Sequence, residues 1–187
     1  MAAMNRFERW MVNRRTEARA RRVLAAVGPH VPAFAASHVL ELGSGRGGLL
    51  ALIQERYRPA RLVGTDFDPV QVAAARAFLT ERWGKVPPTL ELQAADALRL
   101  PFPDRSFDLV FAMMMLHHVE ERHLEYVRRP EALREIRRVL RPGGTFVYSE
   151  IFRRAEIRDS LTELGFVRRF LRSGWRHDLA VFQAPSR

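Results

Sequence analysis

Hydrophobic residues follow two kinds of pattern that alternate along the chain. Short apolar runs predict strands at residues 39–42, 61–65, 89–93, 106–114 and 145–148. Apolar residues spaced three and four apart predict helices at residues 4–27, 49–57, 70–83, 133–140 and 158–164. Pro142-Gly143-Gly144 predicts a break between the helix at 133–140 and the fifth strand. Residues 166–171 and 179–184 are expected to form a terminal hairpin. This alternation favours an α/β fold with a doubly wound sheet that binds ligands at the carboxyl ends of its strands.

The first predicted strand ends at a glycine-rich turn, residues 43–48. Glycines permit positive φ and a close approach of ligand to main chain, and the helix that follows presents unpaired N–H groups. We therefore expect a cofactor at this turn. Gly43, Gly45 and Gly48 fit the G-x-G-x-x-G dinucleotide spacing, and Asp66 lies near the acidic position expected about 20 residues on. A nicotinamide dinucleotide is thus one candidate.

Glu41 favours a different cofactor, because a carboxylate within an apolar strand is costly unless a cation pairs with it. S-adenosylmethionine carries an ammonium and a sulfonium group. Asp66, after the second strand, can accept hydrogen bonds from two ribose hydroxyls. Phe67 suits either the adenine face or the core, and Asp68 is typical of the N-cap of the next helix. Asp96, after the third strand, can bind the exocyclic amine of adenine or cap its own loop.

Six motifs in family order give the chain its resemblance to class I S-adenosylmethionine-dependent methyltransferases of the small-molecule group, which includes the quinone-biosynthesis enzymes. The motifs are residues 39–47, 63–66, 96–97, 100–108, 116–119 and 134–144. The resemblance implies a Rossmann-like, doubly wound seven-stranded sheet with a final antiparallel strand.

The same resemblance assigns cofactor contacts by position. The methionine end would be held by Glu41 and the glycine turn, and the ribose by Asp66. The adenine would lie beside Asp96 and Ala97, and the methyl group beside the strand edge at Ala112 and Met113. The contacts of the turn are expected from Gly43, Ser44, Gly45 and Gly47. Ser44 and Arg46 replace residues that are more frequent in the family, which leaves cofactor binding expected but substrate identity open.

His117 and His118 follow the fourth strand and are the candidates for a general base, should the acceptor be a hydroxyl. The alternative is that these histidines cap or line the cleft. Glu150 and Tyr148, at the end of the next strand, are lesser candidates. No metal is expected, because the side chains of adjacent histidines should diverge and no third ligand is evident.

Composition adds bounds on the setting and the partners of the 187-residue chain. A net charge of +10 comes from arginines concentrated in residues 1–22, 122–141 and 151–187, while cysteine is absent. An anionic small molecule, a lipid surface and nucleic acid are all compatible with this charge, as is a merely solvated surface. We expect an amphipathic helix in residues 1–30 that packs on a methyltransferase domain, residues 31–187. A cytoplasmic location is expected, since no apolar run is long enough to span a membrane.

Three functions remain open at this point. The favoured one is methyl transfer from S-adenosylmethionine to a small-molecule or lipid acceptor, mainly through positioning. The alternatives are an RNA methyltransferase that uses the Arg-rich segments, and a non-catalytic module that only binds the cofactor.

Overall fold

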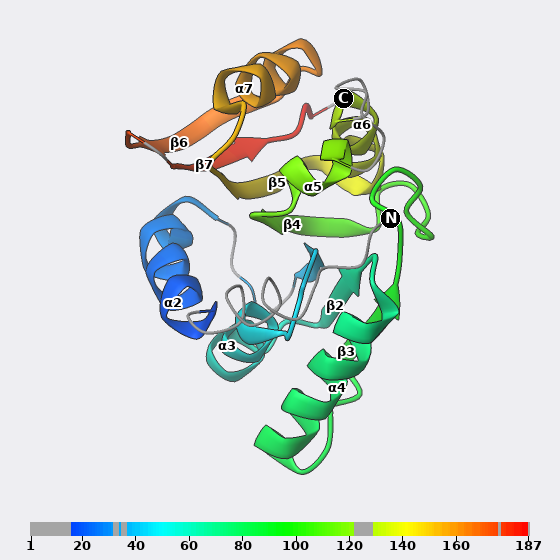
Figure 1. Ribbon diagram of the computed structural model, residues 1–187. Helices are drawn as coiled ribbons and strands as arrows, with labels where there is room; N and C mark the ends of the chain where they lie inside the picture. The colour runs from blue at the N-terminus through cyan, green and yellow to red at the C-terminus, as the bar shows by residue number, and fades with distance from the viewer. Residues whose placement is uncertain (1–15, 32–33, 35–36, 122–128, 176, 187) are drawn as a thin grey trace.

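The computed structural model describes residues 16–31, 34, 37–121, 129–175 and 177–186 (Figure 1). Its strands are β1 (His38–Leu42), β2 (Arg61–Asp66), β3 (Leu90–Ala94), β4 (Phe107–Met113), β5 (Leu140–Glu150), β6 (Val167–Ser173) and β7 (Asp178–Gln183). Its α-helices are α2 (Thr16–Val27), α3 (Gly48–Tyr57), α4 (Pro69–Trp83), α5 (Leu116–Glu121), α6 (Arg129–Val139) and α7 (Arg154–Glu163). Each predicted strand and helix has a counterpart among these elements.

The seven strands form one sheet in the order β3-β2-β1-β4-β5-β7-β6. β1 to β5 are parallel, and β7 runs antiparallel to both β5 and β6. The predicted doubly wound sheet with a final antiparallel strand is confirmed. The strand order reverses at β1 and β4, and ligands of such sheets bind at this switch point, beyond the carboxyl ends of the strands.

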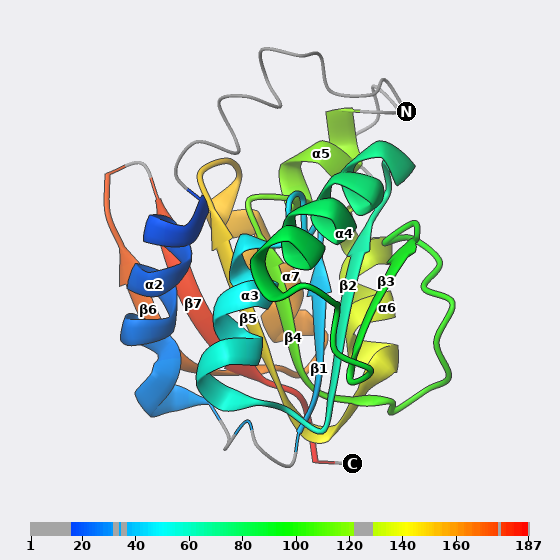
Figure 2. The ribbon, with the colours of Figure 1, turned by 90° about the horizontal axis from the view of Figure 1, so that it is seen from below.

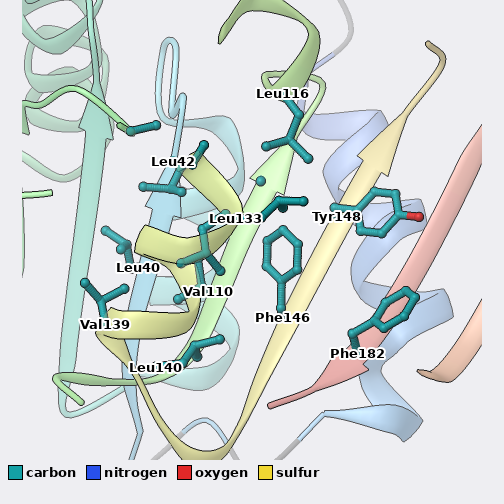
Figure 3. Packing of buried hydrophobic residues seen from close by; sticks show 14 of the residues in the cluster. Leu40, Leu42, Val110, Leu116, Leu133, Val139, Leu140, Phe146, Tyr148 and Phe182 are labelled. Atoms are coloured by element: carbon teal, nitrogen blue, oxygen red, sulfur yellow. The ribbon is translucent and has the colours of Figure 1, made fainter. Parts of the chain in front are cut away.

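Helices cover both faces of the sheet (Figure 2). α2, α3 and α4 pack on one face, and α6 and α7 pack on the other. On the face covered by α6 and α7, side chains of α6 such as Leu133 lie against Val110 of β4 and Phe146 of β5 in a hydrophobic core (Figure 3). Burial on both faces explains why the central strands are continuous apolar runs.

Helix α2 buries one stripe of side chains, Ala20, Val23, Leu24 and Val27, and contacts α3 and β7. The predicted N-terminal helix began at residue 4, but residues 1–15 lie outside the described part of the chain. The division of the chain at residue 30 therefore stays a prediction. Within the described residues, no helix is both long and apolar enough to span a membrane.

The expected break before the fifth strand is wrong. β5 begins at Leu140 and continues through Pro142-Gly143-Gly144. Leu140 pairs with Phe107 and Thr145 pairs with Leu109, so the Pro-Gly-Gly segment forms a bulge within the strand rather than a loop before it.

Two helices begin earlier than predicted. α6 begins at Arg129 and α7 at Arg154, each four residues before its expected start. The first turn of α7 contains no large apolar residue before the buried Ile157, so apolar spacing could not reveal it. In α6, Pro130 lies in the first turn, where its missing N–H breaks no helical hydrogen bond.

Candidate functional site

The glycine turn connects β1 to α3 with three residues in the left-handed region: Gly43 (φ 67°), Gly45 (φ 51°) and Gly47 (φ 78°). A Cβ on Gly43 would lie 2.7 Å from Cβ of Met115, so Gly43 allows the segment between β4 and α5 to pack on the turn. A Cβ on Gly45 would meet nothing within 4 Å. The main chain at Gly45 is therefore open to a ligand.

Glu41 lies beneath this turn with only 3% of its surface exposed. The backbone of Leu50, in the first turn of α3, donates a hydrogen bond to its carboxylate. Its Oε2 has no hydrogen-bond partner within the described residues. Burial first, and the negative charge of Asp66 second, raise the pKa of Glu41 well above its usual value, against the effect of the Leu50 amide. A cation placed here would stabilise the ionised form.

Asp66 ends β2 and holds the glycine turn in place. The Gly45 N–H donates to its Oδ2 at 3.0 Å, and the Asp68 N–H donates to its Oδ1 at 3.0 Å. Each carboxylate oxygen can accept more than one hydrogen bond, so hydroxyl donors can still be bound. Asp68 accepts from the Val70 N–H at 2.9 Å, which confirms it as the N-cap of α4.

The predicted adenine contacts lie at the end of the neighbouring strand. The Ala95 N–H donates to the Asp66 carbonyl at 3.0 Å and joins the end of β3 to the end of β2. Asp96 accepts from the Leu98 N–H at 2.9 Å and so caps its own loop, while Ala97 is buried. Phe67 is partly exposed directly after Asp66. The structure thus places these three residues beside the ribose candidate.

β4 brings the predicted methyl-side edge to the glycine turn. Ala112 pairs with Leu42 of β1 and is fully buried, while Met113 is partly exposed. The chain then turns through Met114 (φ 57°), whose N–H donates to the Ser149 carbonyl at 2.8 Å, and enters α5. The carboxyl ends of β1, β2 and β4 therefore meet at one edge of the sheet.

His117, in α5, is bound to Glu150 at the end of β5. Its Nδ1 lies 2.9 Å from Oε1 and 3.0 Å from Oε2 of Glu150, and its backbone N–H donates to the same carboxylate. Glu150 has no exposed surface, and burial raises its pKa. The His117 hydrogen bond and charge, with the Ile151 amide, outweigh that effect, so the pKa of Glu150 is lowered overall. Because the Glu150 carboxylate accepts a hydrogen bond from Nδ1 of His117, the Nε2 of His117 is left for other partners.

Two expectations about the neighbouring side chains need correction. The rings of His117 and His118 do not diverge, because their centroids lie 4.0 Å apart. Within the described residues, however, no group of three or more His, Asp or Glu side chains is arranged to hold a metal ion. Tyr148 is fully buried, and its hydroxyl points toward β7 (Figure 3). Burial, followed by the charge of Asp178, raises the pKa of Tyr148, so it is poorly suited to act as a base.

Sequence reasoning missed two residues of this edge. Met115 packs on Gly43, and Phe152 lies edge-on to His117 with ring centroids 5.4 Å apart. Neither contact has a signal in spacing or composition, since each joins segments that are distant in the sequence. The nearest clue is that each residue lies two positions after the end of a strand.

Comparison with known proteins agrees with this geometry. The family described as "Methyltransferase domain" matches residues 40–148. A fatty-acid O-methyltransferase of Mycolicibacterium smegmatis is 37% identical over 121 residues, which cover 64% of this chain and 39% of that protein. A demethylmenaquinone methyltransferase of Thermus thermophilus is 36% identical over 116 residues, which cover 62% of this chain and 48% of that protein. The match thus spans less than half of each of these two relatives.

A solved S-adenosylmethionine-dependent methyltransferase of Aquifex aeolicus shares the fold with a TM-score of 0.75 at 14% identity, covering 97% of this chain and 99% of that one. A doubly wound sheet with an acidic, glycine-lined edge thus defines the class as Rossmann-like cofactor-binding proteins. The chain belongs to the methyltransferase-domain family. The cofactor implied by this family is S-adenosylmethionine, and the buried carboxylate of Glu41 and the open backbone at Gly45 fit it.

Proposed function

We propose that the protein transfers a methyl group from S-adenosylmethionine to a small-molecule or lipid acceptor. The observation that carries the proposal is Glu41, a buried carboxylate with one unpaired oxygen, next to Asp66 and below an open glycine turn. A dinucleotide phosphate would place further negative charge beside these two carboxylates. A cationic methionine moiety instead relieves their repulsion.

The roles of the cofactor residues follow from their positions. Glu41 pairs with the cationic methionine end, while Gly43, Ser44, Gly45 and Gly47 let the main chain approach it. Asp66 accepts from the ribose hydroxyls. The adenine lies by Phe67, Asp96 and Ala97, and Ala112 and Met113 border the methyl group. When bound, S-adenosylmethionine supplies an activated methyl group on sulfur, so the protein mainly needs to align the acceptor and exclude water.

His117 is the proposed base for an acceptor that must lose a proton. Glu150 binds its Nδ1 and orients the ring, which leaves Nε2 to take the proton. His118 lies beside that ring and is the second candidate. The named acceptors of the two relatives, a fatty acid and demethylmenaquinone, support an apolar acceptor.

The first experiment compares S-adenosylmethionine with NAD in calorimetric titrations of the purified protein. We expect binding of S-adenosylmethionine alone, and tighter binding of NAD would reject the proposal.

The second experiment incubates the protein with methyl-labelled S-adenosylmethionine and fractionated lysate. We expect label in the lipid or small-metabolite fraction. Label in RNA would establish the alternative that uses the Arg-rich segments, and cofactor binding without any transfer would indicate a non-catalytic module.

A further inference from the structure

Exposed apolar side chains gather beside the acceptor side of the candidate site. Among the described residues, five large apolar side chains are exposed: Val70, Ile151, Phe152, Val167 and Trp175. Ile151 and Phe152 follow β5, and Trp175 lies in the turn between β6 and β7, with 86% of its surface exposed. Three of the five therefore come from two segments at the same edge of the sheet.

Arg154 ties these two segments together. Its guanidinium donates to the Gly174 carbonyl at 2.6 Å and to the Trp175 carbonyl at 3.2 Å. A cavity of about 380 Å³ lies between the segments, lined by Ile151 and Phe152 on one side and Ser173 on the other. The backbone at Trp175 is therefore held beside the segment that carries Ile151 and Phe152, and these three exposed residues are called here the apolar edge patch.

Positive charge surrounds the apolar edge patch. Arg153, Arg154 and Arg158 line the same cavity. Arg153 pairs with Glu156, and Arg154 and Arg158 share the buried Asp178. The charged residues that line the cavity are these three arginines and Glu156, so its lining carries more positive than negative charge.

The patch is continuous with the candidate site. Ile151 and Phe152 directly follow Glu150, and the Phe152 ring contacts the His117 ring. In Figure 2, the turn between β6 and β7 lies at the same upper edge of the sheet as α5, which carries His117. A surface bound at the patch would present its molecules directly to the acceptor side.

Exposed aromatic side chains with a rim of arginines match the boundary of a lipid bilayer. Tryptophan and phenylalanine enter the boundary between headgroups and acyl chains, while arginines attract anionic headgroups. Isolated exposed apolar residues are ordinary, but a connected group marks an interaction site. We propose that the apolar edge patch and the three arginines beside it dock on an anionic lipid surface, with the acceptor side of the site facing the lipid.

The inference rests on the proposed function only in taking the acceptor to be a lipid or other apolar molecule. Docking itself can be measured without catalysis. The test is co-sedimentation with vesicles of phosphatidylcholine alone, or of phosphatidylcholine mixed with phosphatidylglycerol. We expect the protein to bind the anionic vesicles, with a blue shift in tryptophan emission that Trp175→Phe removes. Binding equal on both vesicle types, or to neither, would overturn the proposal.

Matched variants distinguish binding through the apolar edge patch from nonspecific adsorption to vesicles. The double variant Phe152→Ser with Trp175→Ser should weaken binding to anionic vesicles roughly tenfold or more. Its control is Val167→Ser, an equally exposed apolar residue of β6 outside the patch. Arg153→Gln should weaken binding about fivefold on anionic vesicles only, as expected for one interfacial arginine, whereas the exposed Arg134→Gln on α6 should not. Equal losses in the variants and their controls would contradict the patch.

Two further measurements identify other occupants and a failure of the proposed function. A change of oligomeric state in the double variant without vesicles would show that the patch joins two copies of the chain. Arg153-dependent RNA binding in place of vesicle binding would assign the patch to nucleic acid.

Thermal unfolding and S-adenosylmethionine titration of each variant check that the fold and cofactor site persist. Vesicle binding without methyl transfer would support lipid docking and reject the proposed function. Methyl transfer without vesicle binding would support the proposed function and reject lipid docking.

Discussion

At Glu41, the proposed role in cofactor binding and the stability of the fold should oppose each other. In the ligand-free protein its carboxyl group is buried and lacks a partner for Oε2 within the described residues, and burial and the charge of Asp66 disfavour its ionised form. We expect Glu41→Gln to raise the free energy of unfolding of the ligand-free protein by about 1–3 kcal/mol at pH 7. The same change should weaken S-adenosylmethionine binding about 10- to 100-fold, because a charge-assisted contact is lost. Chemical denaturation and calorimetry measure the two effects, and a variant that is both less stable and equally tight-binding would contradict this role.

The pH dependence of that difference has a definite sign. The pKa of Glu41 is higher in the folded than in the unfolded protein. Its contribution to stability is therefore fully present below its ordinary unfolded pKa, and it is lost as pH rises through the folded value. The stability advantage of Glu41→Gln should shrink as the pH is lowered from 7 toward about 4.5. Denaturation midpoints across this range check the sign, and an advantage that grows on acidification would refute it.

Asp66 should matter for both the turn and the cofactor. Its carboxylate binds the Gly45 and Asp68 amides, so Asp66→Ala should loosen the glycine turn and also remove the proposed acceptor for the ribose hydroxyls. We expect a loss of cofactor affinity of about 100-fold, consistent with losing two charge-assisted hydrogen bonds. Asp66→Asn keeps one carbonyl oxygen and serves as the matched control, with a smaller loss. Unchanged affinity in calorimetric titrations of Asp66→Ala would remove this residue from the site.

The pair formed by Glu150 and His117 offers a test by double-mutant cycle. The Glu150 side chain has no exposed surface, and only 12% of the His117 side chain is exposed. Their contact is therefore shielded from solvent. Because the pKa of Glu150 is lowered on folding, the stabilisation is present above its ordinary pKa and is lost as the pH falls through the folded value. Glu150→Gln, His117→Gln and the double variant should reveal a coupling of about 0.5–3 kcal/mol at pH 7 that fades in acid. Additive effects at pH 7 would show that the two side chains are independent.

At the scale of elements, Gly64 of β2 sets how closely α3 packs on the sheet. A Cβ at this position would lie 2.3 Å from Cδ1 of Leu50 and 3.0 Å from Cδ2 of Leu92, both in buried residues. Gly64→Ala should therefore lower the free energy of unfolding by about 1–3 kcal/mol. Adding Leu50→Ala should cost less in this variant than in the wild type, because the clash is already relieved. Gly28→Ala, where a Cβ would meet nothing within 4 Å, is the control, and equal effects at the two glycines would contradict the packing argument.

The elements themselves were largely predictable because hydrophobic spacing and glycine turns are local signals. The switch from the apolar run of β1 to the glycine turn, and the Asp68 cap of α4, could be inferred without knowing any tertiary contact. The bulge at Pro142-Gly143-Gly144 could not, since it depends on the register between β4 and β5. The positions of the strand ends were likewise available from sequence, whereas the contacts of Glu150 with His117 and of Met115 with Gly43 required the fold.

At the scale of the whole molecule, the sheet gathers the cofactor candidates at one edge while the helices on its two faces hold that edge in place. Four strand ends contribute: the glycine turn after β1, Asp66 at the end of β2, Asp96 after β3 and Ala112 in β4. A ligand that contacts all four stabilises the folded state by mass action. Its footprint should then be confined to the loops at these ends.

Amide hydrogen exchange with and without S-adenosylmethionine tests this arrangement. We expect added protection at residues 43–47, 66–68, 95–98 and 112–117, and none in β6 or β7. At a cofactor concentration 100 times Kd, the unfolding free energy should rise by about 2.7 kcal/mol, which corresponds to an increase in Tm of about 5–11 °C for a chain of this size. Glu41→Gln should show a smaller increase at the same concentration, since its affinity is lower. Protection centred on the groove between α4 and β3, where Arg76 and Leu92 line a second cavity of about 660 Å³, would move the cofactor to another site.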